Sequence, residues 1–171
     1  DAQSMTIKEL LELGTEQDRE DFLNLGLGYT QTWGEPSLRE LIASTYDHQA
    51  RADILCFAGA EEGLYIAMHS ILSPEDHAIV ITPNYQSAES IPLSICEVTG
   101  VPLDPEQNWT LDIDAVAKAI RPNTRLVSVN FPHNPTGKIL EHDRFQALVE
   151  LCRKHGIYLF SDEAYRLLGV G

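Results

Sequence analysis

The stretch that decides the fold is residues 126–165, LVSVNFPHNPTGKILEHDRFQALVELCRKHGIYLFSDEAY. It opens with a short apolar run, Leu126–Phe131, and ends with a second one, Ile157–Ser161, which leads into acidic residues. Apolar residues recur at helical spacing between the two runs, and Gly156 closes that pattern. The order of strand, helix and strand predicts two parallel strands joined by a crossover helix. The expected apolar face of this helix consists of Phe145, Leu148, Val149 and Cys152.

Three further apolar runs extend the pattern toward the amino end of the chain: Ile54–Ala58, Ala78–Thr82 and Ser94–Val98. They alternate little between apolar and polar residues, which is typical of strands that helices cover on both faces. The sequence therefore predicts an α/β fold, a three-layer αβα arrangement with a mostly parallel sheet. Ligands of such sheets bind at the carboxyl ends of the strands, so polar residues there are the candidates for a site.

Helical patterns lie between these runs. Pro36 suits the first position of one helix, and Asp112 suits the N-cap of another. The segment Glu61–Leu72 is apolar on most sides, so we expect it to pack on two faces. The residues expected to be buried on the helix after Asp112 are Ile113, Val116, Ala117 and Ile120.

Composition restricts the class of function. Hydrophobic residues make up 43% of the chain and charged residues 22%, which is ordinary for a globular protein. The 26 acidic and 12 basic residues give a net charge of −14, which disfavours binding to nucleic acid or to an anionic membrane. No apolar run reaches the ~18 residues of a membrane span, and the first residues lack the pattern of a secretory signal.

The cysteines and histidines suggest neither disulfides nor a metal site. Cys56, Cys96 and Cys152 are odd in number, far apart and placed in apolar segments, so we expect buried free thiols and a cytoplasmic location. None of the six histidines has metal-ligand spacing to a cysteine or a second histidine, so no metal site is predicted.

Small and polar residues follow the first two apolar runs. Gly59-Ala60-Glu61 opens a helix, and its backbone N–H groups could hold a phosphate, although a plain turn into the helix has the same appearance. Because the carboxylates of Glu61 and Glu62 would repel phosphate, we expect them to point away. Tyr85 could stack on a flat cofactor or serve only in packing.

Polar residues also follow the last two runs. The prolines and glycine around Asn134 fix a turn that could present its amide rigidly or could simply end the strand. His133 is a possible proton carrier or a supporting residue. Asp162 and Glu163 end a buried run, and a charged pair there is costly unless it has partners, which favours a functional role.

In combination, these segments resemble the class I/II aminotransferases, which are pyridoxal-phosphate (PLP) enzymes of fold type I. The resemblance covers residues 24–165 and is most specific at Asn134-Pro135-Thr136-Gly137 and Asp162-Glu163-Ala164-Tyr165. Supporting segments are Tyr29-x4-Gly34-x3-Leu38-Arg39, Gly59-Ala60-Glu61-Glu62 and Pro83-x-Tyr85.

The resemblance implies a role for each matched residue. Asp162 would pair with the pyridine nitrogen of PLP, Asn134 and Tyr165 would bind its ring oxygen, and Tyr85 would stack on its ring. Gly59, Ala60 and Glu61 would bind the phosphate through backbone N–H groups. Tyr29 would reach the phosphate held by a partner subunit, which implies a homodimer with shared sites. The implied substrates are an amino acid and a 2-oxo acid.

The resemblance also implies that part of the site is absent from this chain. The lysine that carries the cofactor in the family follows the matched Tyr165 by several tens of residues, and the arginine that binds the substrate carboxylate comes later still. We therefore expect 1–28 to lead into the domain and 29–171 to form the first half of the PLP-binding large domain, inactive alone.

Other functions fit the same residues. Carbon–sulfur lyases, cyclising synthases and some decarboxylases look similar over this region. A non-catalytic aminotransferase-like module, as in certain transcription regulators, is a further possibility, although nothing here resembles a DNA-binding head.

Overall fold

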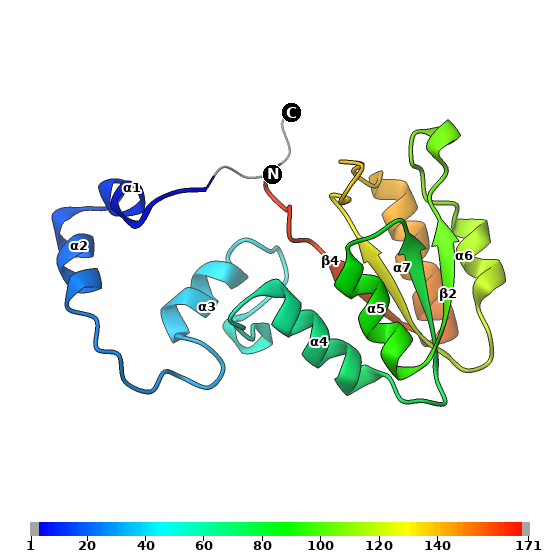
Figure 1. Cartoon of the computed structure of the whole chain (residues 1–171), viewed down its shortest axis with the longest axis horizontal. Coiled ribbons are helices and arrows are strands. Elements are labelled where there is room, and N and C mark those ends of the chain that lie inside the picture. The colour runs from blue at the N-terminus through cyan, green and yellow to red at the C-terminus, as the bar shows by residue number, and fades with distance from the viewer. Residues whose placement is uncertain (1–3, 169–171) are drawn as a thin grey trace. The chain divides into compact units, whose positions relative to one another are not determined.

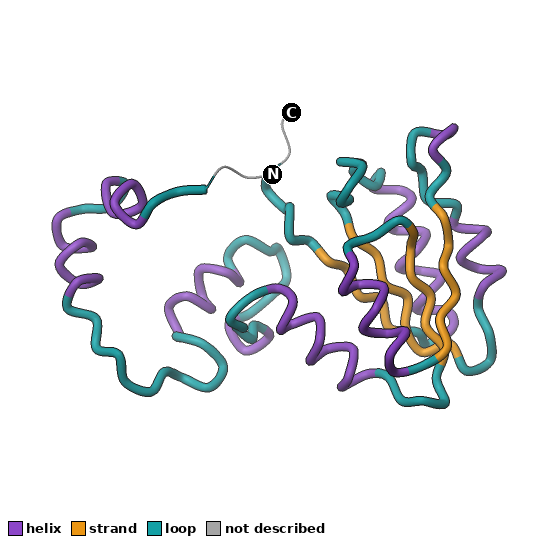
Figure 2. Tube along the Cα trace, viewed as in Figure 1, coloured by secondary structure: helices purple, strands orange, loops and turns teal. Residues whose placement is uncertain are grey.

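The computed structural model describes residues 4–168. Its internal contacts divide the chain into two compact units, Asp1–Cys56 and Phe57–Gly171. Figure 1 shows the helices and strands of both units, and Figure 2 shows the loops that join them. The predicted division between residues 28 and 29 stays a prediction.

The second unit is built on a parallel sheet. Its strands are β1 (His77–Thr82), β2 (Glu97–Pro102), β3 (Thr124–Asn130) and β4 (Tyr158–Asp162), in the order β2-β1-β3-β4. Each neighbouring pair is parallel. The prediction of a parallel sheet is confirmed, since β1, β3 and β4 coincide closely with the apolar runs expected to form them.

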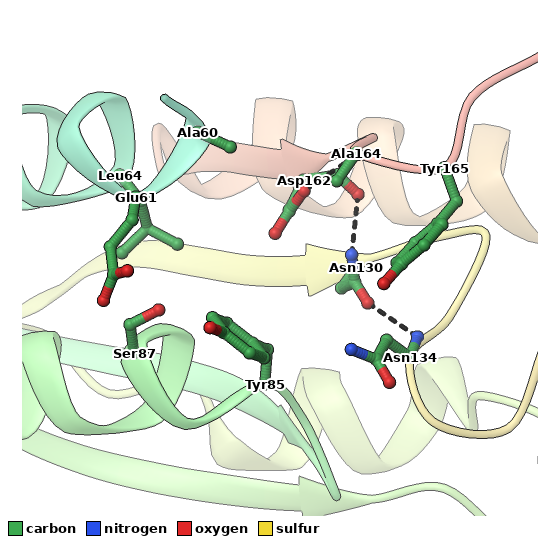
Figure 3. A pocket seen from close by; sticks show the side chains of 10 residues that line it. All are labelled: Ala60, Glu61, Leu64, Tyr85, Ser87, Asn130, Asn134, Asp162, Ala164 and Tyr165. Atoms are coloured by element: carbon green, nitrogen blue, oxygen red, sulfur yellow. Dashed lines mark hydrogen bonds between the residues drawn. The ribbon is translucent and has the colours of Figure 1, made fainter. Parts of the chain in front are cut away.

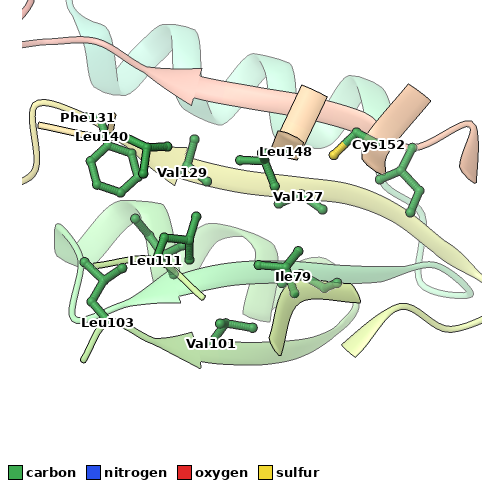
Figure 4. Close-up of a cluster of buried hydrophobic side chains, with 13 residues drawn as sticks. Ile79, Val101, Leu103, Leu111, Val127, Val129, Phe131, Leu140, Leu148 and Cys152 are labelled. Atoms are coloured by element: carbon green, nitrogen blue, oxygen red, sulfur yellow. The ribbon is translucent and has the colours of Figure 1, made fainter. Parts of the chain in front are cut away.

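Helices cover both faces of this sheet. They are α4 (Ala60–Ile71), α5 (Gln86–Ile95), α6 (Ile113–Ala119) and α7 (His142–His155). On one face Ala78 and Leu126 pack with residues of α4 and α5. On the other, Ile79 and Val127 pack with residues of α6 and α7 (Figure 4). Because successive strand residues point to opposite faces, one sheet supplies two cores, and the three-layer αβα prediction is confirmed.

Two of the predicted strands were placed wrongly. Ile54–Ala58 forms no strand, since no described segment pairs with it, and the backbone N–H of Cys56 donates instead to the Trp33 carbonyl at 3.0 Å. The run Ser94–Val98 is split between the end of α5 and the start of β2. Ile95 stays in the helix because, with Ile91 one turn earlier, it packs against the core.

Helix α4 packs on one face rather than on the two faces expected. Leu64 and Met68 are buried against the sheet. Tyr65 and Ile66, on another side of the helix, are 53% and 40% exposed. The apolar residues of this helix therefore leave an uncovered surface on the second unit.

The predicted helix boundaries of the second unit are confirmed by their hydrogen bonds. The Asp112 carboxylate caps α6 by accepting from the Asp114 N–H at 2.9 Å. Gly156 ends α7 with a positive φ of 65°, which a glycine adopts without a steric penalty. Val116 is buried as expected, whereas Ala117 is exposed.

The first unit is helical and has little core of its own. It contains α1 (Ile7–Glu12), α2 (Glu16–Leu23), α3 (Pro36–Ala43) and the short 3-10 helix η1 (Arg51–Asp53). A second 3-10 helix, η2 (Pro105–Gln107), belongs to the other unit. Pro36 is the first residue of α3, as predicted. Arg39 links α3 to η1 and its C-cap, because its guanidinium donates to the carbonyls of Arg51 (2.7 Å) and Ile54 (2.8 Å).

The three cysteines are free, as expected, but only one is fully buried. Cys152 lies in the core, and burial raises the pKa of its thiol to about 11. Cys56 and Cys96 are partly exposed. The expectation of buried thiols therefore holds for Cys152 alone.

His77, at the start of β1, is fully buried and joins three strands. Its Nδ1 lies 2.8 Å from Thr124 Oγ1 on β3, and its Nε2 lies 2.8 Å from Thr99 Oγ1 on β2. Burial, and then the charge of Arg121, hold the pKa of the imidazole below its ordinary 6.5. Burial also lowers the pKa of His133.

These two histidines predict a pH-dependent stability. In the folded protein the pKa of each histidine lies below its ordinary 6.5. At a pH between the folded pKa and 6.5, the unfolded chain therefore binds more protons than the folded chain. The free energy of unfolding should therefore be constant above about pH 6.5 and fall as the pH drops through the folded pKa values. Urea unfolding from about pH 7.5 to about pH 5 measures this. His77→Gln should flatten the dependence, and an unchanged slope in this variant would refute the assignment.

Candidate active site

A cavity of about 230 Å³ lies at the carboxyl ends of β3 and β4 and the amino-terminal turns of α4 and α5 (Figure 3). Both helices begin without a side-chain hydrogen bond at the N-cap, which is Gly59 for α4 and Tyr85 for α5. Such turns present free backbone N–H groups and a positive dipole end. The residues that line the cavity are Ala60, Glu61, Leu64, Tyr85, Ser87, Asn130, Asn134, Asp162, Ala164 and Tyr165.

Most of the predicted site residues meet in this cavity. Six of them line the cavity. A seventh, Gly59, is the N-cap of α4 and directly precedes the lining residue Ala60. Tyr29 belongs to the first unit, where it is fully exposed beside a hollow that it lines with residues up to Pro36. Its predicted role at the phosphate therefore stays a prediction. The six lining residues are Ala60, Glu61, Tyr85, Asn134, Asp162 and Tyr165.

The Asp162 carboxylate is held in place without a neutralising cation. Its Oδ1 accepts a hydrogen bond from the Ala164 N–H at 3.0 Å. Among residues 4–168, no lysine or arginine forms an ion pair with it. A carboxylate that lines a cavity without a cation is a suitable acceptor for the N–H of a positively charged ligand ring.

Asn130 connects the strand ends that carry the site. This last residue of β3 is 2% exposed, and its amide donates to the Asp162 carbonyl at 3.1 Å. Its Oδ1 accepts from the backbone N–H of Asn134 at 2.8 Å, as Figure 3 shows. The prediction missed this residue, although a buried amide at the end of an apolar strand needs partners and is a usable signal.

His133 does not line the cavity but holds two segments beside it in place. Its Nε2 lies 2.7 Å from the Pro83 carbonyl, and its Nδ1 lies 2.7 Å from Thr136 Oγ1. Since a carbonyl only accepts, Nε2 carries the proton and Nδ1 accepts from the threonine hydroxyl. The ring is 2% exposed and fixes the turn before Tyr85 against the Asn134 loop. Of the two roles left open for His133, the geometry favours support.

The two carboxylates at the start of α4 behave differently. Glu62 points away, because its Oε2 accepts from the Ala58 N–H at 2.7 Å. Glu61 lines the cavity, so the expectation that both would point away is wrong for this residue. Within residues 4–168, the Ala58 N–H bonds to Glu62 rather than to Glu61. Three more lining residues, Leu64, Ser87 and Ala164, were also not predicted.

Within residues 4–168, no three histidine, cysteine or acidic side chains come together in a group that could hold a metal ion. The helices of the described part of the chain are all too short or too polar to cross a membrane.

Comparison with known proteins agrees with this geometry. Residues 5–171 match the family model of aminotransferase class I and II. The chain is 30% identical to an aspartate aminotransferase of Pyrococcus horikoshii, over 93% of this chain and 48% of that protein. It is 33% identical to the arginine–pyruvate transaminase AruH of Pseudomonas aeruginosa, over 80% of this chain and 36% of that protein.

Solved structures show the same fold. A PLP-dependent aminotransferase from Streptococcus suis superposes with a TM-score of 0.87 at 29% identity, over 94% of this chain and 44% of that one. The chain thus spans less than half the length of each protein compared here. Since the family model covers nearly all of its residues, the chain belongs to the class I and II aminotransferase family.

Proposed function

We propose that this chain supplies the amino-terminal half of the cofactor site of a PLP-dependent aminotransferase, and that the full-length protein transfers an amino group from an amino acid to a 2-oxo acid. In this proposal, 29–171 is the first half of the PLP-binding large domain and 1–28 leads into it. The observation that carries the proposal is the convergence of Asp162, Asn134, Tyr165, Tyr85 and the start of α4 on one cavity.

The cavity has the donors and acceptors that PLP requires. Asp162 supplies an anion for the pyridine nitrogen, and Asn134 and Tyr165 supply donors for the ring oxygen. Tyr85 offers an aromatic face, and the uncapped start of α4 suits a phosphate. The Ser87 hydroxyl is buried without a partner in residues 4–168, which is typical of a site that receives a further polar group.

The proposed roles follow from charge and hydrogen bonding. When bound, PLP withdraws electrons from the substrate's α-carbon, and a proton on its ring strengthens that effect. Asp162 holds this proton at the pyridine nitrogen, because opposite charges stabilise each other at short range. Asn130 orients the pair of strand ends, so Asp162 and Asn134 keep their spacing.

The lysines of this chain are not suited to carry the cofactor. None of Lys8, Lys118, Lys138 and Lys154 lines the cavity. Lys138, which directly follows the Asn134 loop, has its ammonium 2.5 Å from Glu141 Oε1. The cofactor lysine and the substrate-binding arginine are therefore proposed to lie in a segment outside this chain.

An amino-transfer assay of the full-length protein tests the proposal. The purified protein, loaded with PLP, is incubated with a panel of amino acids and 2-oxo acids, and the new amino acid is measured. Transfer between one such pair is expected. Release of sulfide, carbon dioxide or a cyclised product without transfer would identify another PLP reaction, and inertness toward every donor would favour a non-catalytic module.

The setting of the enzyme is part of the proposal. In this proposal the enzyme is a homodimer, a cytoplasmic location fits the three free thiols, and the net charge of −14 disfavours nucleic acid as a partner. Tyr29 supports shared sites, since its ring is fully exposed on the first unit and free to reach another subunit.

Tyr29→Phe is expected to weaken cofactor retention in the dimer, because the ring stays but the hydroxyl donor is lost. Hybrids of this variant with one that lacks the cofactor lysine should regain activity, since one of the two shared sites then draws intact groups from both chains. Activity of mixed dimers after proven subunit exchange is the measurement, and Tyr158→Phe, at another exposed tyrosine, is the matched control. Hybrids that recover nothing would refute shared sites.

A further inference from the structure

Ser87 carries a polar group that the hydrogen bonds of the described residues leave unexplained. It is the second residue of α5 and is 7% exposed. Its Oγ is buried and has no hydrogen-bond partner within residues 4–168. Burying a hydroxyl without a partner is unfavourable, and each such group in a native protein calls for an explanation, such as strain, a functional role, or a bound water or ion.

The local backbone does not provide the missing partner. A serine in a helix commonly donates to a carbonyl about one turn back, as Ser94 of the same helix does to Ile91 at 2.7 Å. For Ser87 the carbonyls three and four residues back belong to Asn84 and Pro83, and its hydroxyl bonds to neither. The hydroxyl lines the cavity instead.

The position of Ser87 in the cavity indicates which group it would meet. In Figure 3 it lies with Glu61, on the side away from Asn134 and Tyr165. Those two residues are the proposed ligands of the ring oxygen, so the end near Ser87 is the end for the phosphate. The start of α4 lies at this end and offers backbone N–H groups.

This end of the cavity lacks other side-chain donors in the described chain. The methyl group of Ala60 cannot donate, and the carboxylate of Glu61 repels an anion. By donating a hydrogen bond to the phosphate, the neutral Ser87 hydroxyl would gain the partner that it lacks. It would also supply the side-chain donor that Ala60 and Glu61 do not.

We propose that the Ser87 hydroxyl donates a hydrogen bond to the phosphate of PLP, so that the first turn of α5 forms one side of the phosphate site and the first turn of α4 the other. The role rests on the proposed function. It adds a cofactor-binding residue to those that the family resemblance implies.

Binding of two cofactor analogues to the full-length apoprotein tests this role. Pyridoxine 5′-phosphate has no aldehyde, so it binds without a covalent bond to lysine, and pyridoxine lacks the phosphate as well. Ser87→Ala should weaken binding of the phosphorylated analogue about tenfold or more, since a hydrogen bond to a charged group is lost. Binding of pyridoxine should be unchanged, and so should both affinities in the control Ser94→Ala on the same helix.

Two further measurements exclude a merely structural effect. Ser87→Cys keeps nearly the same volume but donates weakly, so it should also lose affinity for the phosphorylated analogue alone. Ser87→Ala should raise the Tm of the apoprotein, because it removes a buried hydroxyl without a partner.

The inference is overturned if Ser87→Ala leaves the affinity for pyridoxine 5′-phosphate unchanged, or if it weakens both analogues equally. Failure of the wild-type apoprotein to bind pyridoxine 5′-phosphate at all would overturn the proposed function itself, and this role with it.

Discussion

In the full-length protein, Asp162→Asn is expected to lower kcat by roughly three orders of magnitude or more, because a neutral amide no longer holds the proton on the cofactor ring in any step that develops charge at the α-carbon. The structure gives Asp162 this role through its place on the cavity and the absence of an ion pair within residues 4–168. Single-turnover kinetics measure the effect directly.

The same substitution should leave the fold intact. The Asp162 Oδ1 accepts a hydrogen bond from the Ala164 N–H, and an asparagine Oδ1 can accept it equally well. The Tm should therefore change little. The neighbouring Glu163→Gln is the matched control, since Glu163 does not line the cavity and its carboxylate lies 3.8 Å from Arg166. A near-normal single-turnover rate in Asp162→Asn would refute the role.

The 171-residue chain by itself is expected to show no amino-group transfer. Its four lysines all precede Asp162 in sequence, and none lines the cavity, so no amine is placed to bind the cofactor or to move the proton of the substrate. Isolated, the chain also leaves Tyr65 and Ile66 of α4 uncovered, and we expect it to associate or to be less stable than the full-length protein.

Reduction with borohydride tests whether a lysine of the isolated chain binds the cofactor. The purified chain is mixed with PLP and reduced, and labelled lysines are mapped by mass spectrometry. Sparse labelling spread over exposed lysines is expected, with one stoichiometrically labelled lysine in the full-length protein as the positive control. Stoichiometric labelling of a single lysine in the chain alone, together with transfer, would contradict the account.

The parts of the site that were predictable lie where sequence pattern and topology coincide. Asp162 and Asn134 follow buried apolar runs, and parallel strands bring their carboxyl ends to one edge. Asn130 follows from the same principle once its burial is considered. The start of α4 was predictable because small residues and a missing cap mark a helix that can bind an anion.

Other features depend on partners that a pattern does not name. The run Ile54–Ala58 is apolar enough for a strand, but a strand also needs a neighbour, and none of the described segments pairs with it. Ser87 was not predictable, because a serine in the first turn of a helix is ordinary. What makes it unusual is that its buried hydroxyl has no hydrogen-bond partner within residues 4–168.

The central claim is that Asp162 meets the pyridine nitrogen of PLP in this cavity, and the protonation state of that nitrogen tests it most directly. PLP labelled with 15N in its ring is bound to the full-length protein and to Asp162→Asn, and the 15N chemical shift is recorded. We expect a protonated ring in the wild type and an unprotonated one in the variant. The same protonation state in both proteins would contradict it.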